Sequence, residues 1–139
     1  LDVIAPWTRL MRERKTATRN EKEVDLPMYV RAHREALILK PNRAYGGQDV
    51  MIGPDMTQAD WEAALAKALE QPDTWVAQEY TPLPTLEYPD PESRELAKEL
   101  VTLGFVATPD GIAFVGRSSR ERIVNISRGG SLVPVLLIS

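Results

Sequence analysis

The sequence has 139 residues and a mass of 15.6 kDa, which favours one compact domain. Its hydrophobic fraction of 43%, charged fraction of 27% and net charge of -3 are typical of a globular protein and exclude disordered, collagen-like and coiled-coil chains. No apolar run approaches the roughly 20 residues of a membrane-spanning helix, so we expect no membrane contact. The absence of cysteine excludes disulfide scaffolds and thiolate metal sites, and it is compatible with the cytoplasmic location that we expect.

Histidine and the basic residues exclude two further classes. His33 is the single histidine, so a histidine-rich zinc site is excluded, and its spacing from Tyr29 places it on a helix face. The basic residues near the start of the chain have no aromatic residues between them, which favours a solvated helix face over a nucleic-acid surface. We therefore expect no nucleic-acid partner.

The first half of the chain contains helix and strand patterns without a regular strand–helix–strand alternation. Asp25 and Pro27 have the positions of an N-cap and a first-turn proline, which predicts a helix to Ala36. Thr57 is the expected cap of a second helix, from Gln58 to Glu70. The other elements expected here are a short helix at 9–18 and strands at 36–41, 50–52 and 74–80.

The second half favours hairpins. Four prolines predict a loop between 82 and 91, and a helix is expected from Pro91 to Leu103, with Gly104 as its stop. The turn signals at 108–111 and 128–131 predict two hairpins, hence a four-strand antiparallel meander. Its expected strands are 105–107, 112–115, 122–127 and 132–138. Helices interspersed with hairpins predict an α+β fold, with a mainly antiparallel sheet and flanking helices.

Lys40 and the glycine pair Gly46-Gly47 are the first candidate binding residues. Lys40 ends a mostly apolar strand, where its ammonium either binds a ligand or simply reaches solvent. Glycines let backbone N–H groups approach an anion closely, although an ordinary hairpin turn also uses them. The Walker and dinucleotide-binding patterns are both absent. With these two patterns excluded, the remaining feature is a strand that ends in Lys40, a glycine loop and a second strand. This hairpin could fold over a triphosphate.

Three more side chains suit a nucleotide site. Glu79 stands at a strand end, where a carboxylate can accept from an adenine amino group or can be an exposed edge residue. Arg117 offers a planar fork for phosphate or carboxylate. Asn125 lies between Val and Ile in an expected strand, as a bulge or edge residue or as an amide-oxygen ligand for magnesium.

The order of these motifs resembles a known family. The chain resembles, over nearly its whole length, the C-terminal portion of circularly permuted ATP-grasp proteins, the group related to glutathionylspermidine synthetase. The residues that carry the resemblance are Pro6-Trp7-Thr8-Arg9, Asp25-Leu26, Leu39-Lys40-Pro41-Asn42, Tyr45-Gly46-Gly47, Val50, Trp61, Trp75-Val76-Ala77-Gln78-Glu79-Tyr80, Gly116-Arg117-Ser118, Val124-Asn125-Ile126-Ser127 and Gly129-Gly130.

The resemblance implies an ATP-grasp nucleotide-binding region across residues 1–139, with ATP held between two α+β subdomains. The family's reaction activates a carboxylate as an acyl phosphate, which an amine then captures. By resemblance, Lys40 contacts phosphate, and the loop at Tyr45, Gly46 and Gly47 covers the triphosphate. The resemblance also implies that Gln78, Glu79 and Tyr80 hold adenine. It further implies that Arg117 acts at the γ-phosphate or acyl group and that Asn125 binds Mg2+. The expected partners are a carboxylate, an amine and the rest of a longer chain.

Three positions and the length depart from the family pattern. Gln48 and Asp49 stand where family members usually have Lys-Gly, and Ile123 stands where a glutamate usually precedes the metal-binding Asn. A carboxylate about 4 Å from a phosphate charge costs roughly 4 kcal/mol at an effective dielectric constant of 20, so Asp49 must point away, bind metal or weaken ATP binding. The chain is also shorter than a full ATP-grasp enzyme. A degenerate, non-catalytic binding module and a plain α+β domain therefore remain alternatives.

Overall fold

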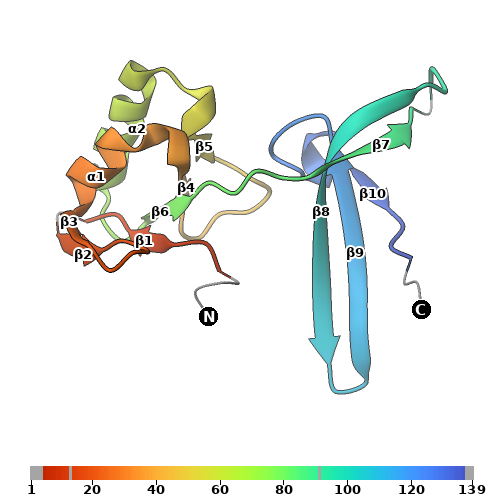
Figure 1. Ribbon diagram of the computed structural model, residues 1–139, viewed down its shortest axis with the longest axis horizontal. Helices are drawn as coiled ribbons and strands as arrows, with labels where there is room; N and C mark the ends of the chain where they lie inside the picture. The colour runs from red at the N-terminus through yellow and green to blue at the C-terminus, as the bar shows by residue number, and fades with distance from the viewer. Residues whose placement is uncertain (1–4, 13, 91, 137–139) are drawn as a thin grey trace. The chain divides into compact units, whose positions relative to one another are not determined.

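The computed structural model describes residues 5–12, 14–90 and 92–136 (Figure 1). The chain forms two compact units, unit 1 from Leu1–Thr81 and unit 2 from Pro82–Ser139, where its length had predicted one. Every strand pair in the described part is antiparallel and two α-helices are present there, which confirms the general α+β class. No helix among the described residues has both the length and the apolar character needed to cross a membrane.

Unit 1 is built on a four-stranded sheet in the order β1-β6-β4-β5. Its strands are β1 (Thr8–Leu10), β6 (Trp75–Glu79), β4 (Leu37–Pro41) and β5 (Met51–Ile52). The strands expected at 36–41, 50–52 and 74–80 are thus confirmed to within a residue or two at each end. The chain also forms a separate hairpin of β2 (Lys15–Ala17) and β3 (Glu23–Asp25).

The helix expected at 9–18 is wrong. β1 and β2 are the regular elements in the described part of this range, and position 13 lies outside the described residues. β1 pairs with the free edge of β6, where Arg9 stands opposite Ala77. Satisfying the backbone groups of an open sheet edge outweighs the weak helix propensity of this short segment.

The two α-helices begin at the caps that the sequence indicates. The Asp25 side chain accepts a hydrogen bond from Met28 N at 3.0 Å at the start of α1 (Leu26–Ala32), which is followed by the 3-10 turn η1 (Arg34–Ala36). Thr57 Oγ1 accepts from Asp60 N at 3.2 Å at the start of α2 (Gln58–Glu70), which follows the 3-10 turn η2 (Gly53–Asp55). Both caps satisfy helix N–H groups that have no partner within the helix.

The core of unit 1 lies between the helices and one face of the sheet. Leu37 and Leu39 of β4 are buried against α2 residues such as Trp61, whose exposed fraction is 0%. The Trp61 indole N–H donates to the Val30 carbonyl of α1 at 2.9 Å, so the buried ring also satisfies its polar atom. Because successive strand side chains alternate, Ile38 and Lys40 lie on the opposite face.

Unit 2 is a four-stranded antiparallel meander in the order β7-β8-β9-β10. Its elements are β7 (Thr85–Pro89), β8 (Leu96–Thr108), β9 (Gly111–Ser119), the 3-10 turn η3 (Ile126–Arg128) and β10 (Ser131–Val133). The hairpin at 108–111 is confirmed, with strands longer than expected. Prolines fit β7 because it is an edge strand, so the loop expected between 82 and 91 is wrong for 85–89.

Two other expectations for unit 2 are also wrong. Residues 96–103, expected as helix, belong to β8, where β-branched Val101 and Thr102 pair with β9. Pro91, the expected start of that helix, lies outside the described residues. The strand expected at 122–127 is absent there, and the one expected at 132–138 is the shorter β10, with 137 and 138 outside the described part.

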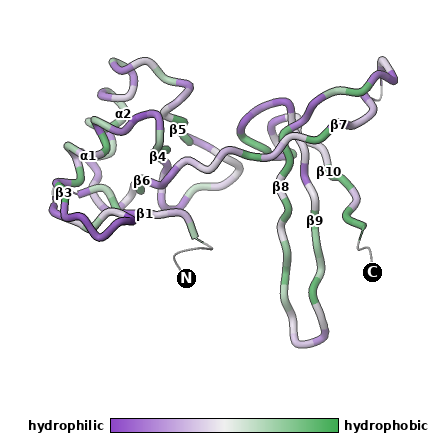
Figure 2. The backbone as a smooth tube through the Cα atoms, viewed as in Figure 1, coloured by the Kyte–Doolittle hydropathy of each residue, from purple (hydrophilic) through white to green (hydrophobic). Residues whose placement is uncertain are grey.

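The far part of the β8–β9 hairpin, residues 103–115, projects as a two-stranded arm (Figure 1). β7 pairs only with 96–100 and β10 only with 116–118, so neither strand flanks the arm. The arm's side chains are largely apolar, as the hydrophobic colours along both strands show in Figure 2, and the exposed fraction of Phe105 is 69%.

We predict that Leu65→Ala destabilises unit 1 by about 2–5 kcal/mol, because Leu65 is 1% exposed and the substitution leaves a cavity between α2 and the sheet. Tryptophan fluorescence in a urea titration measures this, since Trp7, Trp61 and Trp75 all belong to unit 1. The matched control is Met28→Ala, an exposed site on α1, with an expected change within about 0.5 kcal/mol. Equal effects of the two substitutions would contradict the described core.

Candidate functional site

Lys40 and Gln78 lie on the same face of the unit 1 sheet. In the pairing of β4 with β6, Lys40 stands opposite Val76 and Ile38 stands opposite Gln78. Directly opposed residues share a face, so Lys40 and Gln78 are diagonal neighbours there. This is the face opposite α1 and α2, and it also carries Ile38, Ile52, the buried Val76 and, from β1, Thr8 and Leu10. An ammonium and an amide thus flank an apolar surface.

The glycine pair forms a tight turn in the loop that follows β4. Gly46 and Gly47 have φ of 68° and 72°, and Gln48 N donates to the Tyr45 carbonyl at 3.1 Å across them. Two successive residues at positive φ favour glycine strongly, so the pair is required for this turn. Tyr45 has an exposed fraction of 92%. The turn alone therefore accounts for the glycines, with or without an anion.

Asp49 lies beside a cavity on the α2 side of the sheet. The cavity has a volume of about 490 Å³ and is lined by Pro41, Asn42, Arg43, Asp49, Lys67, Gln71, Asp73, Thr74 and Trp75. In it, Lys67 Nζ lies 5.2 Å from the centre of the Trp75 ring. Trp75 lies on the face of the sheet that is turned to the core, whereas Lys40 lies on the opposite face. Asp49 is therefore placed with α2 residues and not with the face that carries Lys40.

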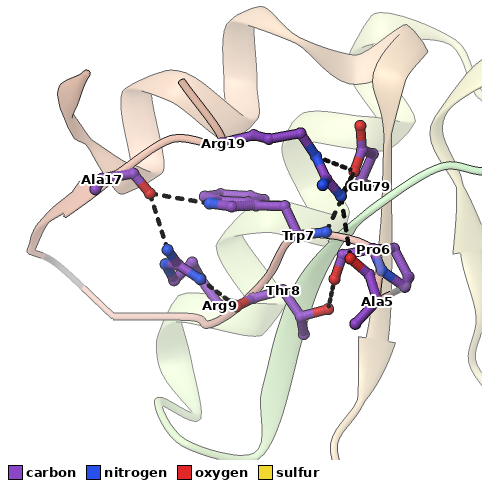
Figure 3. A network of polar contacts seen from close by, with 8 residues as sticks. All are labelled: Ala5, Pro6, Trp7, Thr8, Arg9, Ala17, Arg19 and Glu79. Atoms are coloured by element: carbon purple, nitrogen blue, oxygen red, sulfur yellow. Dashed lines mark hydrogen bonds and ion pairs between the residues drawn. The ribbon is translucent and has the colours of Figure 1, made fainter. Parts of the chain in front are cut away.

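The Glu79 carboxylate binds the N-terminal segment of unit 1 (Figure 3). Its Oε2 atom accepts from Trp7 N at 3.2 Å and from Arg19 Nε and Nη2 at 3.0 and 2.5 Å. Arg19 Nη2 also donates to the Ala5 carbonyl at 3.1 Å. Glu79 stands opposite Leu37, three positions along β4 from Lys40, or about 10 Å at the usual rise of a strand. Glu79, which the resemblance assigns to adenine, therefore holds the N-terminal segment of unit 1 to β6.

This arrangement lowers the pKa of Glu79 below its ordinary value of 4.5. The hydrogen bond from the Arg19 side chain is the largest cause. Partial burial acts in the opposite direction, while the Trp7 N–H and the charge of Arg19 add to the lowering. The carboxylate therefore stays ionised at neutral pH, when it accepts hydrogen bonds and donates none.

The backbone next to Glu79 is also occupied. Glu79 N donates to the Trp7 carbonyl at 2.8 Å, and Tyr80 N donates to the Ala36 carbonyl at 2.8 Å. Two main-chain donors that could have read an adenine edge are therefore used within unit 1. Gln78 lies in β6 on the face that carries Lys40, whereas Glu79 lies on the opposite face.

Arg117 and Asn125 belong to unit 2. Arg117 lies in β9, opposite Thr102 of β8 and Leu132 of β10. Asn125 is not in a strand, contrary to expectation, but precedes η3, and its Nδ2 donates to Ser127 Oγ at 3.0 Å. The Asn125 carbonyl also accepts from Arg128 N and Gly130 N, each at 3.0 Å. Asn125 therefore organises the turn that leads into β10.

Asn125 alone does not make a magnesium site. Mg2+ is usually held by one or two carboxylates together with substrate phosphates. No group of three or more His, Cys, Asp or Glu side chains in the described part of the chain could hold a metal ion. Ile123, two residues before Asn125, supplies no ligand atom. The protein groups present offer one amide oxygen, so a dedicated protein-built Mg2+ site does not fit these residues.

The chain is similar to several mycobacterial proteins. Uncharacterized proteins of Mycobacterium leprae, Mycobacterium bovis and Mycobacterium tuberculosis are each 32% identical to it over 103 aligned residues. The similarity covers 68% of this chain and 18% of each relative, so the chain spans less than a fifth of the length of the curated relatives it matches. No protein-family model matches the chain.

Sequence reasoning missed two residues. Arg19 is the partner of Glu79, and nothing in the local pattern links residues 60 positions apart. Thr102 stands opposite Arg117 of β9. The sequence predicts a helix over this segment, and a helix gives Thr102 no partner across strands. Knowing that 96–108 is a strand would have paired it with Arg117.

We predict that Glu79→Gln lowers the stability of unit 1 at neutral pH and flattens its acid dependence. A carboxyl group with a lowered folded-state pKa contributes stability above its ordinary pKa, and loses it as pH falls below 4.5. Because the Arg19 and Glu79 side chains are 39% and 40% exposed, solvent screening limits the effect at pH 7 to about 1 kcal/mol.

Urea titrations followed by tryptophan fluorescence at pH 7 and pH 3 measure this difference. The wild-type advantage over Glu79→Gln is expected at pH 7 and should shrink at pH 3. Glu70→Gln, an exposed site at the end of α2, is the matched control and should behave like the wild type at both pH values. An advantage that persists unchanged at pH 3 would contradict the role given to the ion pair.

Proposed function

We propose that the chain is the ATP-binding region of an ATP-grasp-like ligase, which joins a carboxylate to an amine through an acyl phosphate. The observation that carries the proposal is the placement of Lys40 of β4 and Gln78 of β6 on one sheet face, opposite α1 and α2, with the Gly46-Gly47 turn in the loop that follows β4. Such a face offers a cation for phosphate, an apolar surface for a purine ring and an amide for its polar edge.

Each candidate binding residue of unit 1 then has a defined role. Lys40 contacts the phosphates, the loop at Tyr45, Gly46 and Gly47 covers them, and the Gln78 amide reads the adenine edge. Glu79 and Tyr80 then have a structural part at this end of β6, because the Glu79 carboxylate and both backbone N–H groups are already hydrogen-bonded within unit 1. This assignment moves the adenine contact from Glu79 to Gln78.

The proposed reaction has two steps. A carboxylate oxygen attacks the γ-phosphorus of ATP, ADP leaves, and the amine then attacks the carbonyl carbon of the acyl phosphate and releases inorganic phosphate. Protein catalysis of such transfers is mainly positioning and charge stabilisation, for which Lys40 supplies a cation in unit 1. Mg2+ would reach the site bound to ATP, whose phosphate charge it would neutralise, since the described residues form no dedicated Mg2+ site. The proposed carboxylate and amine substrates are small molecules, and the rest of a longer chain completes the enzyme. Because the reaction consumes ATP, the proposed location is the cytoplasm.

A second candidate is a degenerate ATP-grasp module that serves binding or interaction without catalysis. The observation that favours it is the missing acidic group beside Asn125, where Ile123 stands and the described residues contain no metal-binding cluster. Such a module keeps the fold of both units but gains little from Mg-ATP.

We predict that Mg-ATP stabilises the protein and that Lys40→Ala removes this effect. Ligand at about 100 times its dissociation constant adds roughly 2.7 kcal/mol to the folded state, which a thermal-shift assay detects. Lys22→Ala, which removes the same charge from an exposed position, is the matched control and should keep the shift. A shift in wild type that survives Lys40→Ala would refute this placement of the phosphates, and a very small shift would favour the degenerate module.

We also predict that Asp49→Asn changes the dissociation constant of ATP less than threefold, because Asp49 lines the α2-side cavity and not the face of Lys40. A carboxylate close to the triphosphate would instead repel it by several kcal/mol, and its removal would tighten binding more than a hundredfold. Titration with a fluorescent ATP analogue separates the two outcomes. Strong tightening would place Asp49 at the phosphates.

A further inference from the structure

A cavity of unit 1 that the proposed function does not use lies where β4 ends and β6 begins. Its volume is about 490 Å³, and the end of the sheet beside it is marked by Pro41, which stands opposite Trp75. The last turn of α2, which carries Lys67, forms another wall. Ligand pockets commonly have volumes of about 300–1,000 Å³, so this cavity is large enough for a small molecule.

Among the described residues, four charged side chains line the cavity, and three of them have no charged partner. Asp73 pairs with Arg12 and is thereby neutralised. Arg43, Lys67 and Asp49 form no ion pair in the part of the chain that the structure describes. All three are exposed, so a dissolved ligand can reach them. Two cations and one carboxylate are therefore available in one cavity.

The wall between α2 and β6 is fixed before any ligand binds. Lys67 Nζ lies 5.2 Å from the centre of the Trp75 ring, and this cation–π contact holds the ammonium beside the cavity. Trp75 itself is 4% exposed and belongs to the core. The turn that joins α2 to β6 is closed by Thr74, whose N and Oγ1 donate to the Gln71 carbonyl at 3.2 and 2.7 Å. Such preorganisation lowers the entropic cost of binding.

The three unpaired side chains specify the charge pattern of a matching ligand. A simple anion such as phosphate would be attracted by Arg43 and Lys67 but repelled by Asp49, and a simple cation would meet the reverse. A ligand that satisfies all three groups carries two carboxylates and one ammonium. Its net negative charge also balances the excess of one positive charge among the three side chains.

We propose that this cavity binds a free acidic α-amino acid, with its two carboxylates at Arg43 and Lys67 and its ammonium at Asp49. The Arg43 guanidinium can hold a carboxylate through two parallel hydrogen bonds, whereas Lys67 acts as a point charge. Asp49, which has no part in the proposed nucleotide site, is then a binding residue. The cavity lies on the α2 side of the sheet and Lys40 on the opposite face, so this inference does not rest on the proposed function.

The test titrates the whole isotope-labelled chain with sodium L-glutamate at neutral pH and constant ionic strength. The readout is the indole Nε1–Hε1 signal of Trp75 in a nitrogen–proton correlation spectrum, assigned by its loss in Trp75→Phe. A saturable shift is expected with a dissociation constant of about 1 mM, because exposed ion pairs are individually weak. The absence of a saturable shift up to about 20 times that concentration would overturn the proposal.

Two analogues of glutamate separate the proposed contacts. Glutarate lacks the ammonium, and 4-aminobutyrate lacks one carboxylate. Each is expected to bind about threefold or more weakly than glutamate, which corresponds to the loss of one exposed ion pair. Equal binding of glutarate and glutamate would indicate a surface that attracts any anion and would refute the assignment of Asp49.

Asp49→Asn isolates the ammonium contact, because asparagine keeps the shape of aspartate and removes its charge. It is expected to weaken glutamate binding by about threefold or more and to leave glutarate binding unchanged or tighter, which abolishes the preference between them. Arg43→Gln and Lys67→Gln should each weaken the binding of both ligands. Asp110→Asn and Lys22→Gln, which remove the same charges from exposed sites, are the matched controls. A preference for glutamate that survives Asp49→Asn would contradict the proposal.

Lys40→Ala separates this inference from the proposed function. Glutamate binding that persists in Lys40→Ala, together with loss of the Mg-ATP shift, is the result expected when both proposals hold. If wild type shows no Mg-ATP shift but keeps the glutamate titration, the proposed function fails and the amino-acid site stands. If the glutamate titration fails while the Mg-ATP shift remains, the amino-acid site alone is refuted.

Discussion

The antiparallel pairing of β4 with β6 decides which side chains of unit 1 can share a ligand. It sets Lys40 opposite Val76 and Ile38 opposite Gln78, which fixes one face for the helices and the other for the candidate site. A register slip of one residue would send Lys40 into the core and Leu39 to the open face. The buried Leu37 and Leu39 prevent this slip, so hydrophobic burial on one face orients the polar groups on the other.

Glu79 illustrates how a residue expected to bind a ligand can instead be structural. Its carboxylate accepts hydrogen bonds from three N–H donors of Trp7 and Arg19, and its lowered pKa keeps it ionised. The N-terminal segment is thereby fastened to the same strand that carries Gln78. The position of the Gln78 side chain thus depends on a contact made by its neighbour, even though Glu79 itself turns to the other face.

Local signals in the sequence predicted some elements well and others poorly. The helix at 58–70 was predictable because Thr57 caps it and its apolar residues repeat at helical spacing. The helix expected at 91–103 failed because pairing with β7 and β9 outweighed local propensity. The strand that carries Lys40 and the glycine turn followed from sequence, whereas the Arg19–Glu79 pair and the pairing of Thr102 with Arg117 arise from strand register and chain folding, which no local pattern encodes.

The arm at 103–115 bears on how the protein must be handled in solution. Its two edges expose backbone N–H and C=O groups, its strands carry no charged side chain, and Asp110 in the turn between them is its only charge. Natural sheets usually protect such edges with lysine, proline or bulges, because a bare edge recruits further strands. At high concentration the arm is therefore the segment from which fibrillar or amorphous precipitation would start, and a lysine introduced on it is the simplest remedy.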